Sequence, residues 1–211
     1  MMYGIPMFGN YGRQQQINTQ QYGFDARLTD GIKNGSLNRD EATRLWQYDN
    51  QTHQMEGEFM KDGYLSESEK NILGARNRYN ERMMALYGQG DFHPLPLTQP
   101  QNAVEARMQN QFNRTFNGIH DGSLTRNEGI RSLQHQGNNA TEYGRVSYNF
   151  MGQKFMSPFA NMYMNNRLNG TGAEIFGLRH NFARDMGSPL PPNMSWGNPF
   201  AGFAWNPFRN F

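Results

Sequence analysis

The chain has 211 residues, of which 36% are apolar, with a mean hydropathy of -0.88 and a formal net charge of +2. Amides dominate its polar residues, with 25 Asn and 16 Gln against 4 Lys and 16 Arg. A nearly neutral chain with scattered positive charges is unlike nucleic-acid-binding proteins, which concentrate basic residues in one patch. The absence of cysteine excludes disulfides, thiolate catalysis and cysteine-bound zinc. No apolar run is long enough to predict a membrane span.

The first sixteen residues differ in composition from those that follow. Residues 1–16 are rich in Gly, Met and aromatic side chains, which predicts an extended arm with Tyr3, Phe8 and Tyr11 available for intermolecular contacts. A basic segment followed by an apolar one, the signature of a secretory leader, is not visible in this stretch. Either the protein is not secreted by that route, or the chain begins after a cleaved leader.

Residues 17–88 predict a first helical unit. Apolar residues recur there at the spacing of amphipathic helices, as in Phe24, Leu28 and Ile32. Two copies of a short motif divide the unit, NGSLNRDE at 34–41 and DGYLSESE at 62–69. The pattern therefore predicts three helices joined by two related turns. Further core positions follow from the same spacing: Leu45, Trp46, Phe59, Met60, Ile72, Tyr79, Met83 and Leu86.

Residues 89–101 contain three prolines and predict a linker to a second helical unit over 102–186. The second unit repeats the first, because residues 26–45 match 113–132 at a constant offset of 87. A third motif copy, DGSLTRNE, lies at 121–128. The fourth would fall near 150–158, where Asp and Glu are absent, so this quarter has either decayed or been rebuilt. The spacing predicts core positions and a short last helix: Met108, Phe112, Phe116, Ile119, Phe155, Phe159, Tyr163 and residues 172–186.

Residues 187–211 form a second arm, rich in Pro, Gly and aromatic residues. The prolines exclude a regular helix, and so short a segment cannot bury its large side chains by itself. The predicted fold is therefore all-α: a duplicated helical unit flanked by extended aromatic arms. Six aromatic side chains of the second arm are predicted to contact neighbouring molecules: Trp196, Phe200, Phe203, Trp205, Phe208 and Phe211.

The repeated motif matches the second half of a calcium-binding EF-hand loop, with Gly, Leu and Glu at corresponding positions in all three copies. The third loop position, which needs an oxygen ligand, is apolar each time: Ile32, Met60 and Ile119. Calcium is the cofactor that this pattern suggests, and the second copy is the richest in carboxylates. The oxygen-bearing candidates are Asp30, Asn34, Glu41, Glu58, Asp62, Glu69, Asn117, Asp121 and Glu128.

The same motif residues also predict a metal-free turn between two helices, and we favour this interpretation. Asn/Asp-Gly ends a helix, because glycine adopts the left-handed conformation at low cost. Asn, Ser or Thr then caps the next helix, and a Glu three residues later completes a capping box. The sequence predicts three such boxes: Asn38 with Glu41, Ser66 with Glu69, and Thr125 with Glu128.

The run Gly-Ile-x-x-Gly-x-Leu-[Thr/Asn]-x-x-Glu, followed by Asp-Gly-x-Leu-Ser-x-x-Glu, resembles small helical EF-hand-like repeat proteins of bacterial envelopes. The resemblance covers residues 24–88 and 105–135 and leaves out the arms and the linker. It implies a helical fold and a bacterial, exported or envelope setting. The function of that family is poorly defined, so the resemblance implies no activity.

No catalytic motif is present, and the five histidines are scattered along the sequence, so we expect no enzyme and no small-molecule substrate. Two functions stay open. The first is a structural subunit, extracellular or on the cell surface, that assembles with copies of itself into a filament, sheath or particle coat through its aromatic arms. The alternative is a monomeric calcium-responsive binding module of the bacterial envelope.

Overall fold

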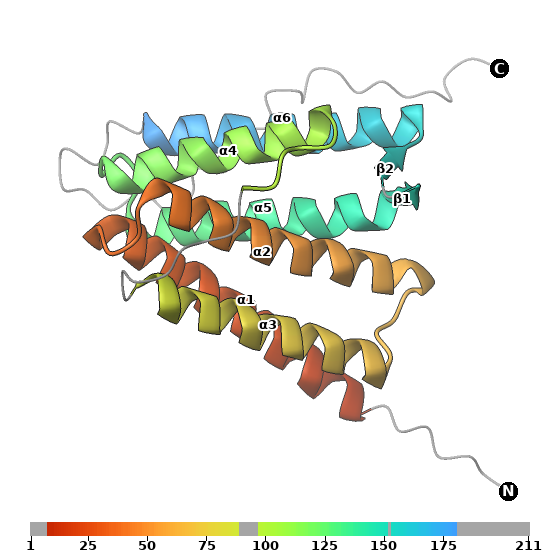
Figure 1. Cartoon of the computed structure of the whole chain (residues 1–211). Helices are drawn as coiled ribbons and strands as arrows, with labels where there is room; N and C mark the ends of the chain where they lie inside the picture. Colours follow the sequence, from red (N-terminus) through yellow and green to blue (C-terminus); the bar gives the residue numbers. More distant parts are fainter. Residues whose placement is uncertain (1–7, 89–96, 152, 181–211) are drawn as a thin grey trace, which may run out of the picture. The chain divides into compact units, whose positions relative to one another are not determined.

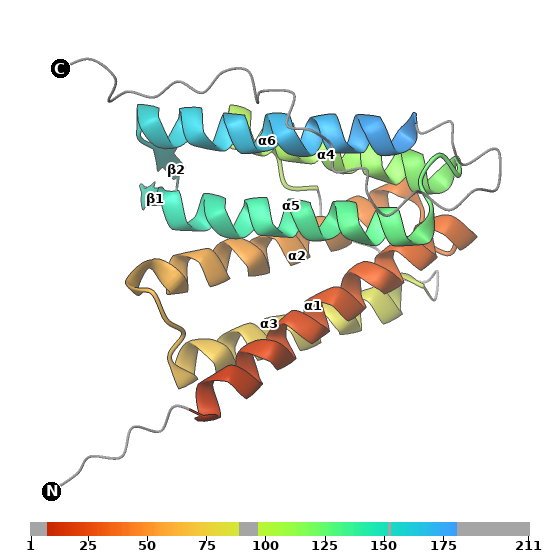
Figure 2. The same cartoon turned by 180° about the vertical axis from the view of Figure 1, so that it is seen from behind.

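The computed structural model describes residues 8–88, 97–151 and 153–180, which are mostly helical (Figure 1). The described residues up to Arg179 form one compact unit, so the two predicted helical units pack together. Three layers of helices follow one another in both views, α4 with α6, α2 with α5, and α1 with α3 (Figures 1 and 2). The elements are α1 Phe8–Asn34, α2 Arg39–Phe59, the 3-10 turn η1 Met60–Asp62, α3 Glu67–Tyr87, α4 Ala103–His120, α5 Arg126–Val146, β1 Ser147–Phe150, β2 Gln153–Met156 and α6 Pro158–Arg179.

The three motif copies form the predicted capped turns. Asn38, Ser66 and Thr125 accept a hydrogen bond from the backbone of the Glu three residues later, and that Glu accepts one from the cap backbone. The glycines Gly35, Gly63 and Gly122 have φ of 76°, 95° and 78°, where a side chain would be strained. The capping boxes are therefore confirmed as the structural role of the motif.

A leucine in each turn closes the turn against the core. Leu37 donates its backbone N–H to Gly31 at 3.1 Å, and Leu124 makes the same bond to Gly118 at 2.7 Å. Both leucine side chains are buried against these glycines, where an added Cβ would lie within 2.5 Å or 2.7 Å of the leucine. The sequence Gly-Ile-x-x-Gly-x-Leu therefore encodes one packed turn, used twice.

The core is confirmed along α1 and α4, where every predicted apolar position is buried, and Trp46 of α2 stacks on Phe112 with ring centroids 4.8 Å apart. Along α3 the prediction is confirmed for Met83, which is buried, and wrong for three other positions. Ile72 is 43% exposed, and Tyr79 and Leu86 are also exposed. The face of α3 that packs inward includes the amides Asn77 and Asn80, and Asn80 donates to Thr52 Oγ1 at 3.2 Å. Apolar spacing misses a buried face that is partly polar.

Helices α2 and α5 touch backbone to backbone at two glycines. A Cβ on Gly57 would lie 1.8 Å from the carbonyl oxygen of Thr141, and one on Gly144 would lie 2.1 Å from that of Gln54. Gly57 and Gly144 are separated by the repeat offset, and so are Gln54 and Thr141. The contact is therefore reciprocal between equivalent positions, as in a symmetric dimer. The two repeats pair through this crossing.

Four other expectations need correction. Helix α1 begins at Phe8, so the extended arm predicted through residue 16 is helical from there. The region of the missing fourth motif is a β-hairpin, with Ser147 opposite Met156 and Phe150 opposite Gln153, so this quarter of the repeat has been rebuilt and the fold is not purely α. The last helix is a single segment, Pro158–Arg179, because no turn motif interrupts it. Phe155, Phe159 and Tyr163, predicted as core, are exposed.

Candidate functional site

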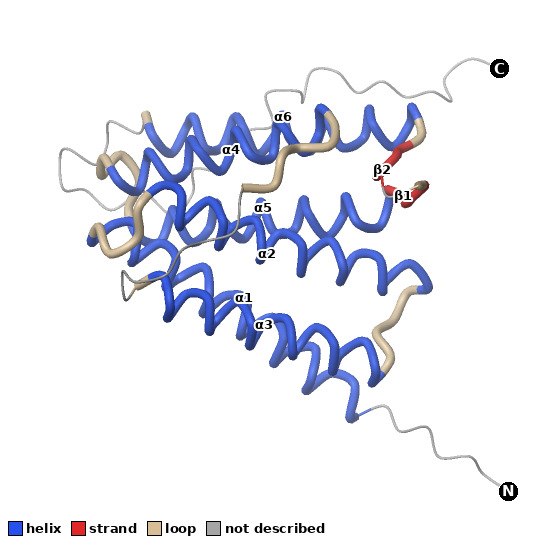
Figure 3. The backbone as a smooth tube through the Cα atoms, viewed as in Figure 1, coloured by secondary structure: helices blue, strands red, loops and turns tan. Residues whose placement is uncertain are grey.

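The three motif turns lie at two ends of the helical unit. The turns joining α1 to α2 and α4 to α5 lie at one end, and the α2–α3 connection lies at the other, beside which the hairpin is found (Figure 3). The nine candidate metal ligands are thus divided among separate turns. In the described part of the chain, no three His, Asp or Glu side chains form a group that could hold a metal ion.

The candidate ligands of the first and third turns have protein partners. Glu41 and Glu128 complete the capping boxes. Asp30 binds Arg126 at 2.6 Å, and Asp121 binds Arg179 at 2.8 Å. Asn34 and Asp121 each accept a backbone N–H two residues ahead at 2.9 Å, from Ser36 and Ser123, and Asn117 accepts a hydrogen bond from Arg39. The same side chains therefore organise the turns directly.

The second turn, the richest in carboxylates, is organised in the same way. Glu69 accepts from Ser66 Oγ at 2.7 Å, and this hydrogen bond lowers the pKa of Glu69. Asp62 accepts the backbone N–H of Tyr64 at 3.2 Å. Glu58 binds Lys154 of the hairpin at 3.0 Å. Glu58 thus connects the α2–α3 end to the hairpin and does not turn toward the other two candidates of its own turn.

A buried cluster of charged side chains was missed by the sequence reasoning. His53 of α2 lies between two carboxylates of its own helix, with Nε2 3.4 Å from Asp49 and Nδ1 3.7 Å from Glu56. Burial lowers the pKa of His53, but the two carboxylates outweigh it and raise that pKa to about 10. Asp25 of α1 is buried beside them, and burial together with Asp49 raises its pKa well above the ordinary value. The available signal was the spacing of Asp49, His53 and Glu56 along one helix face.

This cluster borders a polar hollow of about 460 Å³ between α1, α2 and α5. Gln21 donates to Glu56 at 3.1 Å, and His53 Nδ1 lies 3.1 Å from Thr141 Oγ1. His53 also packs on Gly137, where a Cβ would lie 2.5 Å from its Nε2. The His53 imidazolium is therefore a buried positive charge inside the helical unit, and its position is fixed by the two carboxylates and by Gly137.

The most conspicuous surface feature is a group of exposed apolar side chains on the hairpin and α6. We call it the hairpin–α6 surface and define it by Tyr148, Phe150, Met151, Phe155, Phe159, Met162 and Tyr163. Met151 is 88% exposed and Phe159 is 74% exposed. Phe155 lies at the centre of a ring cluster, with centroids 6.0 Å from Tyr148 and 6.3 Å from Phe150. Exposed apolar side chains that gather on neighbouring elements are typical of an interaction site.

The hairpin–α6 surface carries almost no charge. Between residues 147 and 166 the sequence has one charged residue, Lys154, whose Nζ binds Gln54 and Glu58. Other surface amides in this stretch, such as Asn161 and Asn165, are neutral. Arg167 also borders the surface, with its guanidinium 5.9 Å from the centroid of the Tyr163 ring. A nearly uncharged apolar segment would therefore meet less charge repulsion there than a second copy of the surface would.

The residues predicted to carry self-assembly lie mostly outside the described part of the chain. Tyr3 and the six aromatic residues of 187–211 fall outside it altogether. Phe8 and Tyr11 lie in the first turns of α1, where the structure gives the backbone of the helix. The hairpin–α6 surface was missed, because Phe155, Phe159 and Tyr163 were predicted as helix core and the hairpin was not predicted.

The chain matches no protein-family model, and neither the curated proteins nor the solved structures contain a similar protein. The resemblance to envelope proteins with EF-hand-like turns therefore stays a prediction. None of the helices in the described ranges is long and apolar enough to cross a membrane.

Proposed function

We propose that the protein is a non-enzymatic structural subunit that assembles with copies of itself. The hairpin–α6 surface is the observation that carries this proposal, because seven large apolar side chains stand exposed on one neutral region. Burying a single phenylalanine on association is worth about 2 kcal/mol. A few such side chains suffice for a stable contact between subunits.

The occupant that we assign to this surface is the segment 187–211 of a neighbouring copy. That segment contains six aromatic residues and a single charged residue, Arg209, so it matches the hairpin–α6 surface in both polarity and charge. Surface and segment differ from each other, so the contact is heterologous. A heterologous contact that does not close into a ring propagates as a filament. We further place this assembly outside the cell or on its surface, consistent with a cysteine-free, amide-rich chain.

The test compares two double variants of the full chain by sedimentation velocity and negative-stain electron microscopy. Phe159→Ser with Met162→Ser should abolish assemblies that the wild type forms, since loss of Phe159 burial alone weakens each contact roughly 30-fold. The control, Ile72→Ser with Leu86→Ser, removes two exposed apolar side chains from α3 and should assemble like the wild type. A wild-type chain that stays monomeric at all concentrations would refute the proposal.

A third variant identifies the occupant. Trp205→Ser with Phe208→Ser should reduce assembly as strongly as the surface variant, because both remove one side of the same contact. If the tail variant assembles normally while the surface variant does not, two hairpin–α6 surfaces contact each other and the assigned occupant is wrong. Protease accessibility of the protein on intact source cells tests the surface location separately.

A further inference from the structure

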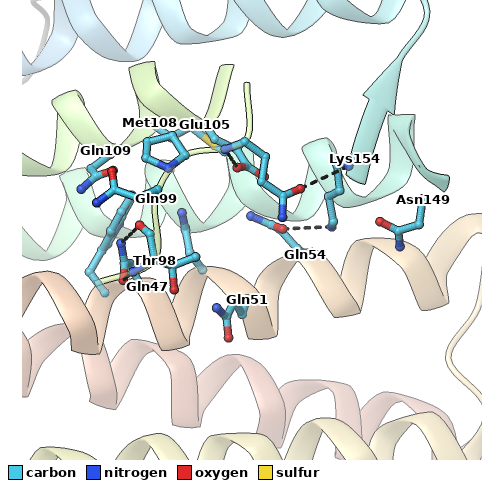
Figure 4. A pocket seen from close by; sticks show the side chains of 14 residues that line it. Gln47, Gln51, Gln54, Thr98, Gln99, Glu105, Met108, Gln109, Asn149 and Lys154 are labelled. Atoms are coloured by element: carbon cyan, nitrogen blue, oxygen red, sulfur yellow. Dashed lines mark hydrogen bonds between the residues drawn. The ribbon is translucent and has the colours of Figure 1, made fainter. Parts of the chain in front are cut away.

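A second hollow, of about 220 Å³, lies between α2, α4 and the segment 97–102, and amide side chains line most of it (Figure 4). From α2 come Gln47, Asn50, Gln51 and Gln54, which the helix repeat places on one face. Gln99 and Gln101 come from the segment before α4, and Gln109 comes from α4 itself. Trp46, Met108 and Pro100 supply an apolar wall. We call this hollow the amide groove.

Two of the amides hold the groove in shape. Gln47 donates to the carbonyl of Thr98 at 2.9 Å and accepts the Thr98 N–H at 3.1 Å, so its side chain pairs with the backbone as a strand would. Gln101 accepts from the backbone of Lys154 at 3.2 Å. These bonds fasten the 97–102 segment to α2 and to the hairpin. The groove is therefore built by specific contacts.

Other amides in the groove have no protein partner. Asn50 is only 6% exposed, and its side chain makes no hydrogen bond to any described residue. The amide atoms of Asn50 are not among the buried side-chain atoms that lack a hydrogen-bond partner, so this amide faces the open space of the hollow. Gln99 and Gln109 also make no hydrogen bond within the described ranges. Unpaired donors and acceptors therefore gather around one hollow.

The groove has an equivalent on the other side of the α2–α5 crossing. Four positions of the amide groove have counterparts, at the repeat offset of 87, in the polar hollow that His53 borders. The pairs are 47 with 134, 51 with 138, 54 with 141, and 105 with 18. Two positions distinguish them. In the polar hollow, the His53 ring packs on Gly137. At the repeat offset, His53 corresponds to Ala140, and Gly137 corresponds to Asn50. In the amide groove, the methyl group of Ala140 therefore takes the position of the imidazole, and it offers Asn50 no hydrogen-bond partner.

The lining of the groove contains one negatively and one positively charged side chain, Glu105 and Lys154. Its two charged side chains are already engaged, Glu105 with the backbone N–H of Gln101 at 2.7 Å and with Tyr143, and Lys154 with Gln54 and Glu58. What is left is a set of amides, each able to donate and accept, beside an apolar wall. Hydroxyl groups likewise donate and accept, and a sugar ring presents several of them around an apolar C–H face.

From this geometry we infer that the amide groove binds a neutral saccharide unit, with Asn50 and Gln109 hydrogen-bonding its hydroxyl groups against the wall formed by Trp46 and Met108. The hollow has room for about seven water molecules, which suits one sugar ring. Charged sugars are disfavoured because no free charge is available to pair with them. The inference is independent of self-assembly, since the groove and the hairpin–α6 surface share none of the residues that define that surface.

The experiment uses the full chain with Trp196→Phe and Trp205→Phe, so that Trp46 is the sole tryptophan. Its fluorescence is titrated with three neutral probes, maltotetraose, cellotetraose and tetra-N-acetylchitotetraose. We expect a saturable change with at least one probe, and the same affinity in about 0.5 M salt, because a neutral ligand is not screened. No change with any of the three would overturn the inference.

Asn50→Leu separates binding from folding. The leucine is of similar size and replaces an amide that makes no hydrogen bond to a described residue, so the thermal unfolding temperature should stay the same or rise. Saccharide affinity should nevertheless fall at least about tenfold, as it should for Gln109→Ala. The control Asn71→Leu, on the exposed face of α3, should change neither. Unchanged affinity in both groove variants would show that the saccharide binds elsewhere, and a response to an Asn/Gln-rich peptide alone would replace the ligand class.

Discussion

Individual polar residues decide most of what is unusual in this protein. A chain poor in apolar residues still forms a core, because amides, hydroxyls and one imidazolium are buried with partners. Asn80 with Thr52, Asn139 with Thr171 at 2.8 Å, and Gln136 with Thr115 at 2.9 Å are examples. Such bonds add little net free energy but are costly to break singly. The stability of the fold should therefore respond strongly to single polar substitutions.

His53 provides the clearest case. Its folded pKa of about 10 exceeds its unfolded value, so its stabilising effect is complete below about pH 6.5 and is lost as pH rises toward 10. Asp25, whose pKa is raised, contributes with the same sign, and His135 of α5 borders the same hollow. We expect the urea midpoint to fall between pH 7 and pH 10, and this fall to be much smaller in His53→Gln. At pH 7 that substitution should cost about 3–5 kcal/mol, because it leaves buried carboxylates without their cation. A flat profile in the wild type would contradict the assigned charge on His53.

At the scale of elements, the capped turns fix where helices begin and the paired glycines fix how closely two of them approach. The capping boxes could be predicted from the sequence because every contact in them is local, spanning three residues. The glycine crossing could not be predicted, because Gly57 and Gly144 lie far apart in the sequence. Taken singly, each is only a residue of low helix propensity inside a helix. The polar buried face of α3 was mispredicted for a related reason: its partners lie on other helices.

The third turn distinguishes capping from calcium binding. Thr125→Ala removes a cap and should lower stability by about 1 kcal/mol, a fall of roughly 2–4 °C in Tm. Glu128→Gln keeps a residue that completes a capping box and should change Tm little. Thr19→Ala, which alters an exposed threonine inside α1, serves as the control. Both results should be the same in calcium and in EDTA. A calcium-induced rise in Tm that Glu128→Gln abolishes would instead favour a metal-binding loop.

We expect opposite effects on stability from two Gly→Ala substitutions, one at the α2–α5 crossing and one in α6. Gly144→Ala places a methyl group 2.1 Å from the carbonyl oxygen of Gln54, so the helices must separate, and we expect a loss of about 2 kcal/mol. Gly170→Ala, inside α6, has nothing within 4 Å and should stabilise the protein by about 0.5–1 kcal/mol. Urea unfolding measures both. Equal effects would show that helix propensity alone governs these glycines.

At the scale of the whole molecule, the duplication was visible in the sequence, and so were the helices and the turns. How the repeats pair was not visible, and neither were the two hollows that flank the pairing, because both depend on contacts between repeats. Phe155, Phe159 and Tyr163 were predicted as core since their spacing suits a helix. The structure places them on a hairpin and on the outer face of α6, which changes their expected role from packing to association.

The hairpin also determines how many partners one subunit can have. Two perfect repeats around the α2–α5 crossing would present every surface twice, so each molecule would offer two adhesive sites and could branch or cross-link. Because only the second repeat ends in the hairpin, the described unit presents that surface once. In the assembly that we propose, with one site and one tail, each subunit would make two contacts and its two ends would be distinguishable. Growth would then be linear and polar, and the broken internal symmetry of the subunit would give the assembly a direction.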